Sequence, residues 1–351
     1  MPRFGISVNG LHLHWPTRWP DLFRRDAPLV LEIGFGSGHF LTDLAAQHPD
    51  WDLIGVERSY YSVVETEGRV TKAGLPNVRL IYADAKLVLA YICAPATMDA
   101  IYVNFPDPFP KKAHAKRRLL TPATLALLTS RLKPGGQLTI ATDVVAYAES
   151  VAESLTQTAG LHNLHTTRWV NAIPGRPPTR YERKALDRGE PCYYFEWTRT
   201  ASAESPELPP PPFPQPVELP MPNAIISTPL TFDQMAAQFT PHIDHTPPFR
   251  IHFLGLYQAQ PYTALLIDTF VDEPLIEQRV GILIARQATD RFPDHFVIRL
   301  DALGYPRPTP GTHAAIALIV DWLAALHPDS KILHRAIQDT PREMNQDEAE
   351  S

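Results

Sequence analysis

The chain has 351 residues, 44% of them hydrophobic, which is enough for two domains with a sizeable core. Its two cysteines, Cys93 and Cys192, fit no CxxC or Cys/His pattern, which excludes a disulfide-rich scaffold and a structural zinc site. The formal net charge of -6 is unevenly spread, because residues 217–351 hold 17 acidic and 9 basic side chains, whereas residues 1–216 hold 21 and 23. The overall acidity therefore does not exclude a nucleic acid partner for the N-terminal part.

The N-terminus lacks the charged start and apolar core of a signal peptide, and no run approaches about 18 apolar residues. We therefore expect a cytoplasmic protein with no membrane partner, present as a monomer or homodimer. Residues 1–28 mix Pro, Trp, His and Arg without periodicity, and we expect them to form a loosely ordered arm.

The next segment is typical of the opening of a nucleotide-binding unit. Residues 29–33 (LVLEI) predict a buried strand, residues 34–38 (GFGSG) a glycine turn, and residues 39–48 a helix. Gly34 and Gly36 would let the backbone approach a ligand closely. Taken alone, such a glycine pattern is equally consistent with an ordinary tight turn.

Two acidic residues near this turn favour one class of nucleotide. A second strand over residues 53–56 ends at Glu57, about 20 residues beyond the glycines, where an acidic group usually binds ribose hydroxyls. Glu32 lies inside the first strand, and a carboxylate there repels pyrophosphate and attracts an ammonium group. The arrangement favours S-adenosylmethionine over NAD, with a dinucleotide oxidoreductase as an alternative.

Further acids follow the later strands. Predicted strands over residues 78–82, 98–103 and 137–141 are separated by predicted helices, and the carboxyl ends of such strands line a ligand crevice. We therefore expect four carboxylates on one rim of the sheet, although one or two could instead cap helices, as Asp84 could do for a helix over residues 85–92. The four are Glu57, Asp84, Asp107 and Asp143.

Residues 104–110 (NFPDPFP) carry three prolines, which forbid a helix or central strand and force a turn. The turn presents Asp107 between two aromatic residues, and a basic tract follows it. A carboxylate can accept from a base edge, an aromatic ring can stack on the base, and a basic tract can neutralise phosphates. The pattern predicts a site for a nucleotide within a polymer, against the alternative of a rigid loop followed by a solvated charged surface.

The rest of this half is less informative. We expect helices over residues 121–132 and 144–157, an edge strand over 163–170, and a final strand over 193–197. Residues 171–192 between these two strands predict a polar, mobile surface loop.

The C-terminal part differs in composition. Residues 201–222 hold nine prolines from Pro206 to Pro222 and predict an extended linker. An α+β domain of unknown role is expected over residues 223–336, followed by an acidic tail over 337–351, and its scattered histidines indicate no metal. Its predicted helices cover residues 231–239 and 313–326, and its predicted strands cover 250–259, 263–271, 278–285 and 296–300.

Six motifs together resemble one known family. They are LEIGFGSG (31–38), GVE (55–57), ADA (83–85), NFPDPFPKKAHAKRR (104–118), ATD (141–143) and TRYE (179–182). Over residues 29–199 the chain is similar to the single-chain bacterial tRNA (guanine-N7)-methyltransferases. The resemblance implies a Rossmann-like class I S-adenosylmethionine-dependent methyltransferase domain over residues 29–200. It also implies tRNA as partner and N7 of the variable-loop guanine at position 46 as target.

The resemblance also implies roles for individual residues. S-adenosylmethionine would be bound by Glu32, Gly34, Gly36, Glu57, Asp84 and Asp107. The substrate nucleotide would be bound by Lys111, Asp143, Thr179, Arg180, Tyr181 and Glu182, and the RNA backbone by Lys112, Lys116, Arg117 and Arg118. The chain departs from the family in having Phe109 where Trp is usual, and in its short N-terminal arm.

Guanine N7 already carries a lone pair, so methyl transfer there needs no general base. We expect Asp107 to be the catalytic residue as an anchor and electrostatic partner of the purine. Asp143 and Glu182 would accept hydrogen bonds from guanine N1 and N2. Two alternatives are a methyltransferase for another RNA or a small molecule, and a non-catalytic RNA-binding protein with this fold.

Overall fold

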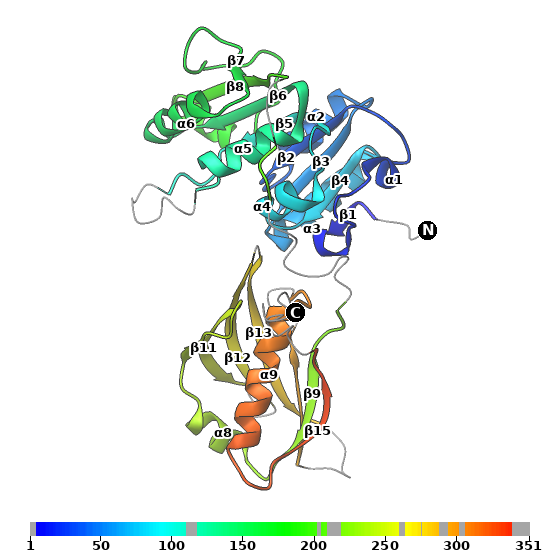
Figure 1. Cartoon of the computed structure of the whole chain (residues 1–351), viewed down its shortest axis with the longest axis vertical. Helices are drawn as coiled ribbons and strands as arrows, with labels where there is room; N and C mark the ends of the chain where they lie inside the picture. Colours follow the sequence, from blue (N-terminus) through cyan, green and yellow to red (C-terminus); the bar gives the residue numbers. More distant parts are fainter. Residues whose placement is uncertain are drawn as a thin grey trace, which may run out of the picture. The chain divides into compact units, whose positions relative to one another are not determined.

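The computed structural model describes residues 5–109, 118–201, 205–208, 219–259, 264–274, 276–287, 294–301 and 306–338. Lys111, Lys112, Lys116 and Arg117 of the predicted basic tract, much of the proline-rich segment and nearly all of the acidic tail lie outside these ranges. The chain divides into two compact units, residues 1–216 and 217–351 (Figure 1). Across the described ranges, no helix has both the length and the apolar character needed to cross a bilayer.

The N-terminal unit is built on a mixed sheet, which in its described part has the strand order β1-β4-β3-β2-β5-β6-β8-β7 (Figure 1). Neighbours from β1 to β6 pair in parallel, and β7 and β8 add antiparallel pairs at one end. The predicted α/β Rossmann-like class is confirmed. The strands are β1 (Ser7–Asn9), β2 (Leu29–Ile33), β3 (Asp52–Glu57), β4 (Val78–Tyr82), β5 (Met98–Asn104), β6 (Leu132–Thr142), β7 (Leu161–Asn163) and β8 (Tyr193–Arg199).

Helices connect the parallel strands. α2 contacts α3, whereas α5 contacts both η2 and α6, and right-handed crossovers place these two groups on opposite faces of the sheet. The predicted helix over 85–92 is a short α4 followed by a π-helix, η2. The elements are η1 (Gly10–His12), α1 (Trp19–Phe23), α2 (His39–Gln47), α3 (Tyr60–Ala73), α4 (Ala85–Leu87), η2 (Val88–Ile92), α5 (Pro122–Arg131), α6 (Val145–Gln157) and α7 (Arg180–Asp187).

The expectation of a loosely ordered N-terminal arm is wrong for residues 5–28. β1 pairs in parallel with β4, with Ser7 opposite Leu80, so this segment forms an edge of the sheet. Leu11, Leu13 and Trp19 are buried. Leu11 and Leu13 are two residues apart, as in a strand, but Pro16, Pro20 and the polar residues around them interrupt any sustained alternation. The pattern therefore did not predict order here.

The expectation of a surface loop throughout residues 171–192 is also wrong, because α7 occupies Arg180–Asp187. Thr179 and Glu182 form a capping box, in which each side chain accepts from the other residue's backbone N–H. Two smaller differences concern strands. β6 begins at Leu132, five residues before the expected strand over 137–141. The expected edge strand over 163–170 is wrong, because β7 ends at Asn163 and Val170 makes only an isolated bridge.

The C-terminal unit is an antiparallel sheet with α9 packed across it (Figure 1), and its described strands have the order β10-β11-β12-β13-β14-β9-β15. The predicted helices and four predicted strands are confirmed with shifted ends, whereas β9, β10 and β15 were not predicted. The elements are β9 (Asn223–Ser227), α8 (Phe232–Gln238), β10 (His242–Asp244), β11 (Arg250–Gln258), β12 (Ala264–Glu273), β13 (Ile276–Arg286), β14 (His295–Leu300), α9 (Pro310–Ala325) and β15 (Lys331–Ala336).

Candidate functional site

The site lies where the strand order of the N-terminal sheet reverses. β2 has β3 on one side and β5 on the other, and all three are parallel, so their carboxyl ends flank one crevice. Four carboxylates follow the ends of parallel strands and therefore lie along the same edge of the sheet. Glu57 ends β3, Asp84 follows β4, Asp107 follows β5 and Asp143 follows β6.

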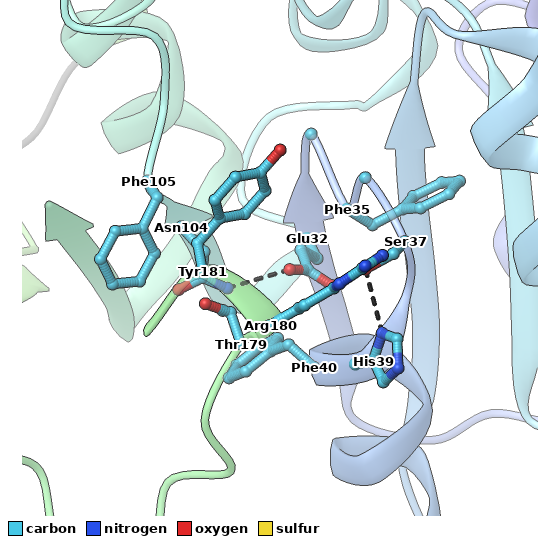
Figure 2. Close-up of a pocket in the computed structure, with 12 residues that line it drawn as sticks. Glu32, Phe35, Ser37, His39, Phe40, Asn104, Phe105, Thr179, Arg180 and Tyr181 are labelled. Atoms are coloured by element: carbon cyan, nitrogen blue, oxygen red, sulfur yellow. Dashed lines mark hydrogen bonds between the residues drawn. The ribbon is translucent and has the colours of Figure 1, made fainter. Parts of the chain in front are cut away.

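A pocket opens at this crevice between three segments of the chain (Figure 2). The turn after β2 and the start of α2 form one side, the end of β5 forms another, and the start of α7 lies over them. Of the predicted site residues, the pocket brings together Glu32, Gly34, Gly36, Thr179, Arg180 and Tyr181, while Glu57, Asp84, Asp107 and Asp143 are outside its lining. The other lining residues are Phe35, Ser37, His39, Phe40, Asn104 and Phe105.

The glycine turn leaves open space in front of its backbone. Gly34 and Gly36 have φ of +73° and +52°, a region that disfavours other residues, and a Cβ atom at either position would meet no atom of the described residues within 4 Å. The Gly36 N–H donates to Glu57 Oε2 at 3.0 Å, while Glu57 Oε1 accepts from the N–H groups of Arg58 and Ser59 at 2.9 Å each. Glu57 therefore fixes the turn relative to the end of β3.

Glu32 is a buried carboxylate with one oxygen left over. Its side chain is 2% exposed, and Oε1 accepts from Asn104 Nδ2 at 2.9 Å (Figure 2). Oε2 is buried and has no hydrogen-bond partner within the described residues. Burial raises the pKa of Glu32 to about 7, with smaller lowering effects from the Asn104 hydrogen bond and the Arg176 charge. A buried carboxylate oxygen without a partner on the wall of a pocket is suited to a cationic donor.

A chain of hydrogen bonds extends from Glu32 to α7 and β8. Asn104 Oδ1 accepts from Arg176 Nη2 at 2.5 Å, and Arg176 Nη1 donates to Glu182 Oε2 at 2.6 Å. The Tyr194 hydroxyl donates to Glu182 Oε1 at 2.6 Å. Both oxygens of Glu182 thus have partners inside the protein, and Glu182 is not among the residues that line the pocket. The predicted guanine contact of Glu182 has no support in this geometry.

The Asp107 loop has an unusual backbone. Phe105 and Phe109 have φ of +50° and +39°, which is strained for residues with a large side chain. Arg118 holds the loop, because its Nε donates to the Pro108 carbonyl at 2.8 Å and its Nη2 to the Phe109 carbonyl at 3.2 Å. Asp107 itself is exposed. Arg118, predicted to contact the RNA backbone, therefore has an internal role in shaping this loop.

Asp84 and Asp143, two of the four carboxylates on this edge of the sheet, differ in whether they cap a helix. Asp84 accepts from the Lys86 N–H at 2.8 Å and caps α4, which is the alternative that the sequence left open for it. Asp143 is exposed, and α6 has no side-chain cap, so Asp143 is not used to begin that helix.

Sequence reasoning missed the three residues that complete the chain from Glu32. Asn104 belonged to a recognised motif but had no role assigned, and Arg176 lay in a segment read as a surface loop. Tyr194 was only part of an apolar strand. The one signal available was the pattern Thr179-x-x-Glu182, which indicates a helix start and hence an ordered segment at Arg176.

The sheet order and the pocket at its reversal point place this chain in the class of Rossmann-like S-adenosylmethionine-dependent methyltransferases. The family model described as "Putative methyltransferase" matches residues 26–195. A tRNA (guanine-N(7)-)-methyltransferase of Nitrosomonas europaea is 38% identical over 209 residues, covering 57% of this chain and 88% of the relative. The chain belongs to the tRNA (guanine-N(7)-)-methyltransferase family.

Other matches cover only parts of the two proteins compared. A tRNA (guanine-N(7)-)-methyltransferase of Thermus thermophilus is 38% identical over 198 residues, so the match spans 55% of this chain and 60% of that relative. Among solved structures, the 16S rRNA methyltransferase KamB matches 52% of this chain and 92% of its own, with 16% identity and a TM-score of 0.41.

Proposed function

We propose that this protein transfers the methyl group of S-adenosylmethionine to N7 of guanine 46 in the variable loop of tRNA. The observation that carries the proposal is Glu32, whose buried Oε2 lacks a partner among the described residues, at the wall of a pocket in a chain of this family. S-adenosylmethionine brings an ammonium group and a sulfonium centre, so it can satisfy that oxygen and offset the burial of its charge. Because tRNA is the proposed substrate, we also place the protein in the cytoplasm.

The residues around the pocket fit this cosubstrate. Glu32 would accept from the ammonium group, and the open backbone at Gly34 and Gly36 would lie against the methionine part. Glu57, at the end of β3, is proposed to bind the ribose hydroxyls, and Asp84 the exocyclic amine of adenine. A carboxylate oxygen has two acceptor sites, so Glu57 Oε2, which accepts one bond, keeps a site for one ribose hydroxyl, and Asp84, which accepts one bond through Oδ1, keeps sites for the adenine amine.

The reaction requires the protein to align guanine N7 with the methyl group, and it requires no proton transfer. The N7 lone pair of guanine forms the new bond to the methyl carbon as the carbon–sulfur bond breaks with its electrons going to sulfur, and no proton leaves. Positive charge passes to the purine, and Asp107 on the rim is proposed to stabilise it and to anchor the base. The loop that carries Asp107 is shaped by Arg118, so the carboxylate is positioned before the substrate arrives.

The start of α7 is the proposed contact for the substrate nucleotide. Tyr181 is 66% exposed and Arg180 is exposed, and both reach over the pocket from α7 (Figure 2). An aromatic ring can stack on a base, and a guanidinium can bind phosphate or a base edge. Asp143 is proposed to accept from guanine N1 and N2. Lys111 is proposed to contact the substrate nucleotide, and Lys112, Lys116 and Arg117 the RNA backbone. These cationic contacts should make binding weaken steeply with salt.

The direct test is to incubate the full chain with labelled S-adenosylmethionine and unmodified tRNA, and then to map aniline-sensitive sites. Cleavage at guanine 46 alone is the expected result. If the labelled methyl group appears in another RNA and not in tRNA, the proposed substrate is wrong but the protein is still a methyltransferase. A titration in which NAD binds and S-adenosylmethionine does not would overturn the class.

A further inference from the structure

Arg176 occupies a central place between the pocket and α7. Its side chain is 4% exposed, and its Cζ atom lies 4.8 Å from the ring centroid of Phe40 and 5.2 Å from that of Tyr194. It donates one hydrogen bond to Asn104 and another to Glu182. A guanidinium that is buried, held by two rings and bonded in two directions has a fixed position, and the two groups it bonds are fixed with it.

The chemistry of these groups also fixes the orientation of Asn104. A guanidinium can only donate and an ionised carboxylate can only accept, so Asn104 must turn its Oδ1 toward Arg176 and its Nδ2 toward Glu32. With its Oε1 held in this way, Glu32 keeps an Oε2 that no group in the described ranges bonds, at the wall of the pocket. The orientation of the pocket carboxylate therefore depends on Arg176 through one amide.

The second bond of Arg176 reaches the helix that carries the proposed substrate contacts. Glu182 Oε2 accepts both from Arg176 Nη1 at 2.6 Å and from the Thr179 N–H at 3.0 Å, which is the second half of the capping box of α7. The first turn of α7, with Arg180 and Tyr181, is thus tied to the same guanidinium as Glu32.

We propose that Arg176 is a positioning residue with two separable effects: through Asn104 and its charge it holds the Glu32 carboxylate ready for S-adenosylmethionine, and through Glu182 it holds α7 in place for the substrate nucleotide. This inference rests on the proposed function. It assigns to a residue outside the recognised motifs a role in binding both substrates without contact to either.

The charges around Glu32 set the direction of the first effect. Two charged groups act on the pKa of Glu32: Arg176 in the segment before α7 and Glu57 at the end of β3. Glu32 in turn contributes to the raised pKa of Tyr102 of β5. Of these groups, Arg176 is the cation and Glu57 raises the pKa of Glu32. Removal of the Arg176 charge should therefore raise the pKa of Glu32 further, so that S-adenosylmethionine binding is lost at a higher pH than in the wild type.

The experiment uses the full chain and three variants. Arg176→Gln removes the charge, and Arg176→Lys keeps the charge but cannot make two fixed bonds. Arg188→Gln is the matched control, because Arg188 ends α7 in an exposed ion pair with Glu190, away from the pocket lining. Calorimetry gives the dissociation constant of S-adenosylmethionine between pH 6 and 9, and turnover assays give kcat and KM for tRNA.

Arg176→Gln is expected to shift the pH midpoint of S-adenosylmethionine binding upward by about one unit. Binding at pH 7, where about half of wild-type Glu32 is already protonated, should weaken about fivefold. Arg176→Lys is expected to keep the wild-type midpoint and to raise KM for tRNA about tenfold. Arg188→Gln should match the wild type in both assays.

Each alternative outcome has a distinct meaning. Equal midpoints for the wild type and a folded Arg176→Gln would overturn the effect of charge, and an unchanged KM for tRNA in Arg176→Lys would overturn the effect of geometry. If Arg176→Gln does not fold, the lysine variant carries the test, since a shifted midpoint in that charged variant would contradict the proposal. Failure of the wild type itself to bind S-adenosylmethionine would instead overturn the proposed function.

Discussion

Each unit of this protein buries a glutamate, and the two differ in one respect. Glu32 of β2 is 2% exposed and Glu273 of β12 is 4% exposed, and burial raises the pKa of both. Glu273 has partners for both oxygens, whereas Oε2 of Glu32 has none in the described part of the chain. Burial and a shifted pKa alone therefore do not separate a binding group from a structural one; the count of satisfied acceptors does.

The partners of Glu273 explain its structural role. Oε1 accepts from the Thr309 hydroxyl and from Gln278 Nε2, and Oε2 accepts from the Gly311 N–H in the first turn of α9 at 3.0 Å. Glu273 thus joins the end of β12 to the beginning of the helix that supplies much of the core of the C-terminal unit. A Cβ at Gly311 would come within 2.7 Å of Val271 and 2.9 Å of the Glu273 carboxyl carbon, so this junction is closely packed.

The largest effect is expected from Glu32→Gln. The amide keeps the size of the side chain but removes the charge, and a charge-assisted hydrogen bond to the cosubstrate is lost. S-adenosylmethionine should bind about 100-fold more weakly by calorimetry, or about 2.7 kcal/mol. Glu273→Gln, the matched change in the other unit, should leave that affinity unchanged. Equal losses from both variants would contradict the distinction drawn between the two glutamates.

The converse change, Glu273→Ala, should act on stability. It removes the Glu273 acceptor from the Thr309 hydroxyl and the Gly311 N–H in a buried place, whereas Gln278 keeps its bond to Thr309. One such loss costs about 1–3 kcal/mol. We expect the free energy of unfolding of the C-terminal unit to fall by about 2 kcal/mol. Urea unfolding, monitored by hydrogen exchange of α9, measures this change. The affinity of the N-terminal unit for S-adenosylmethionine should not change, and a fall in affinity would show that the two glutamates are not independent.

A pH titration separates the binding effect of Glu32 from its effect on stability. Its pKa is raised from 4.5 to about 7 in the fold, so the folded protein holds the proton more tightly than the unfolded chain. The contribution of Glu32 protonation to the free energy of unfolding is full below pH 4.5 and is lost as pH rises toward 7. S-adenosylmethionine affinity should change the opposite way, falling about tenfold per pH unit below 7. Glu32→Gln should abolish this slope, and a wild-type slope in that variant would assign the titration to another group.

The smallest effect is expected for an exposed carboxylate, Asp107. Solvent screens its charge in the absence of substrate, so Asp107→Ala should leave stability and S-adenosylmethionine affinity near the wild-type values. Turnover on tRNA should fall about fivefold, or about 1 kcal/mol, because charge on the methylated purine loses its partner. Asp107→Asn tests whether charge or hydrogen bonding matters, and full turnover in the alanine variant would remove Asp107 from the mechanism.

Much of the fold was predictable because local patterns agree with it. The strand, glycine turn and helix over residues 29–48 and the later apolar strands follow from periodicity and from the glycine and proline signals. The N-terminal segment was not predictable, because Leu11, Leu13 and Trp19 are buried by contacts distant in sequence. β9, β10 and β15 of the C-terminal unit are likewise defined by pairing with other strands.

The candidate site was predictable only in part, for a related reason. Motifs identify residues one at a time, and so they named Glu32 and Glu182 as independent ligand contacts. The structure joins the two through Asn104 and Arg176, and that chain of bonds depends on three segments that meet only after folding. Which carboxylate oxygen remains free is a property of this chain of bonds, and no sequence pattern reports it.

The strained backbone at Phe105 and Phe109 has a consequence for the rate and tightness of substrate capture. With the Pro108 and Phe109 carbonyls held by Arg118, the segment 105–109 has few conformations left to lose when a nucleotide docks. Ordering a flexible segment costs about 1–2 kcal/mol per residue in backbone entropy, and here that loss is met during folding. Docking of a nucleotide therefore does not have to offset this entropy loss, which favours tight capture.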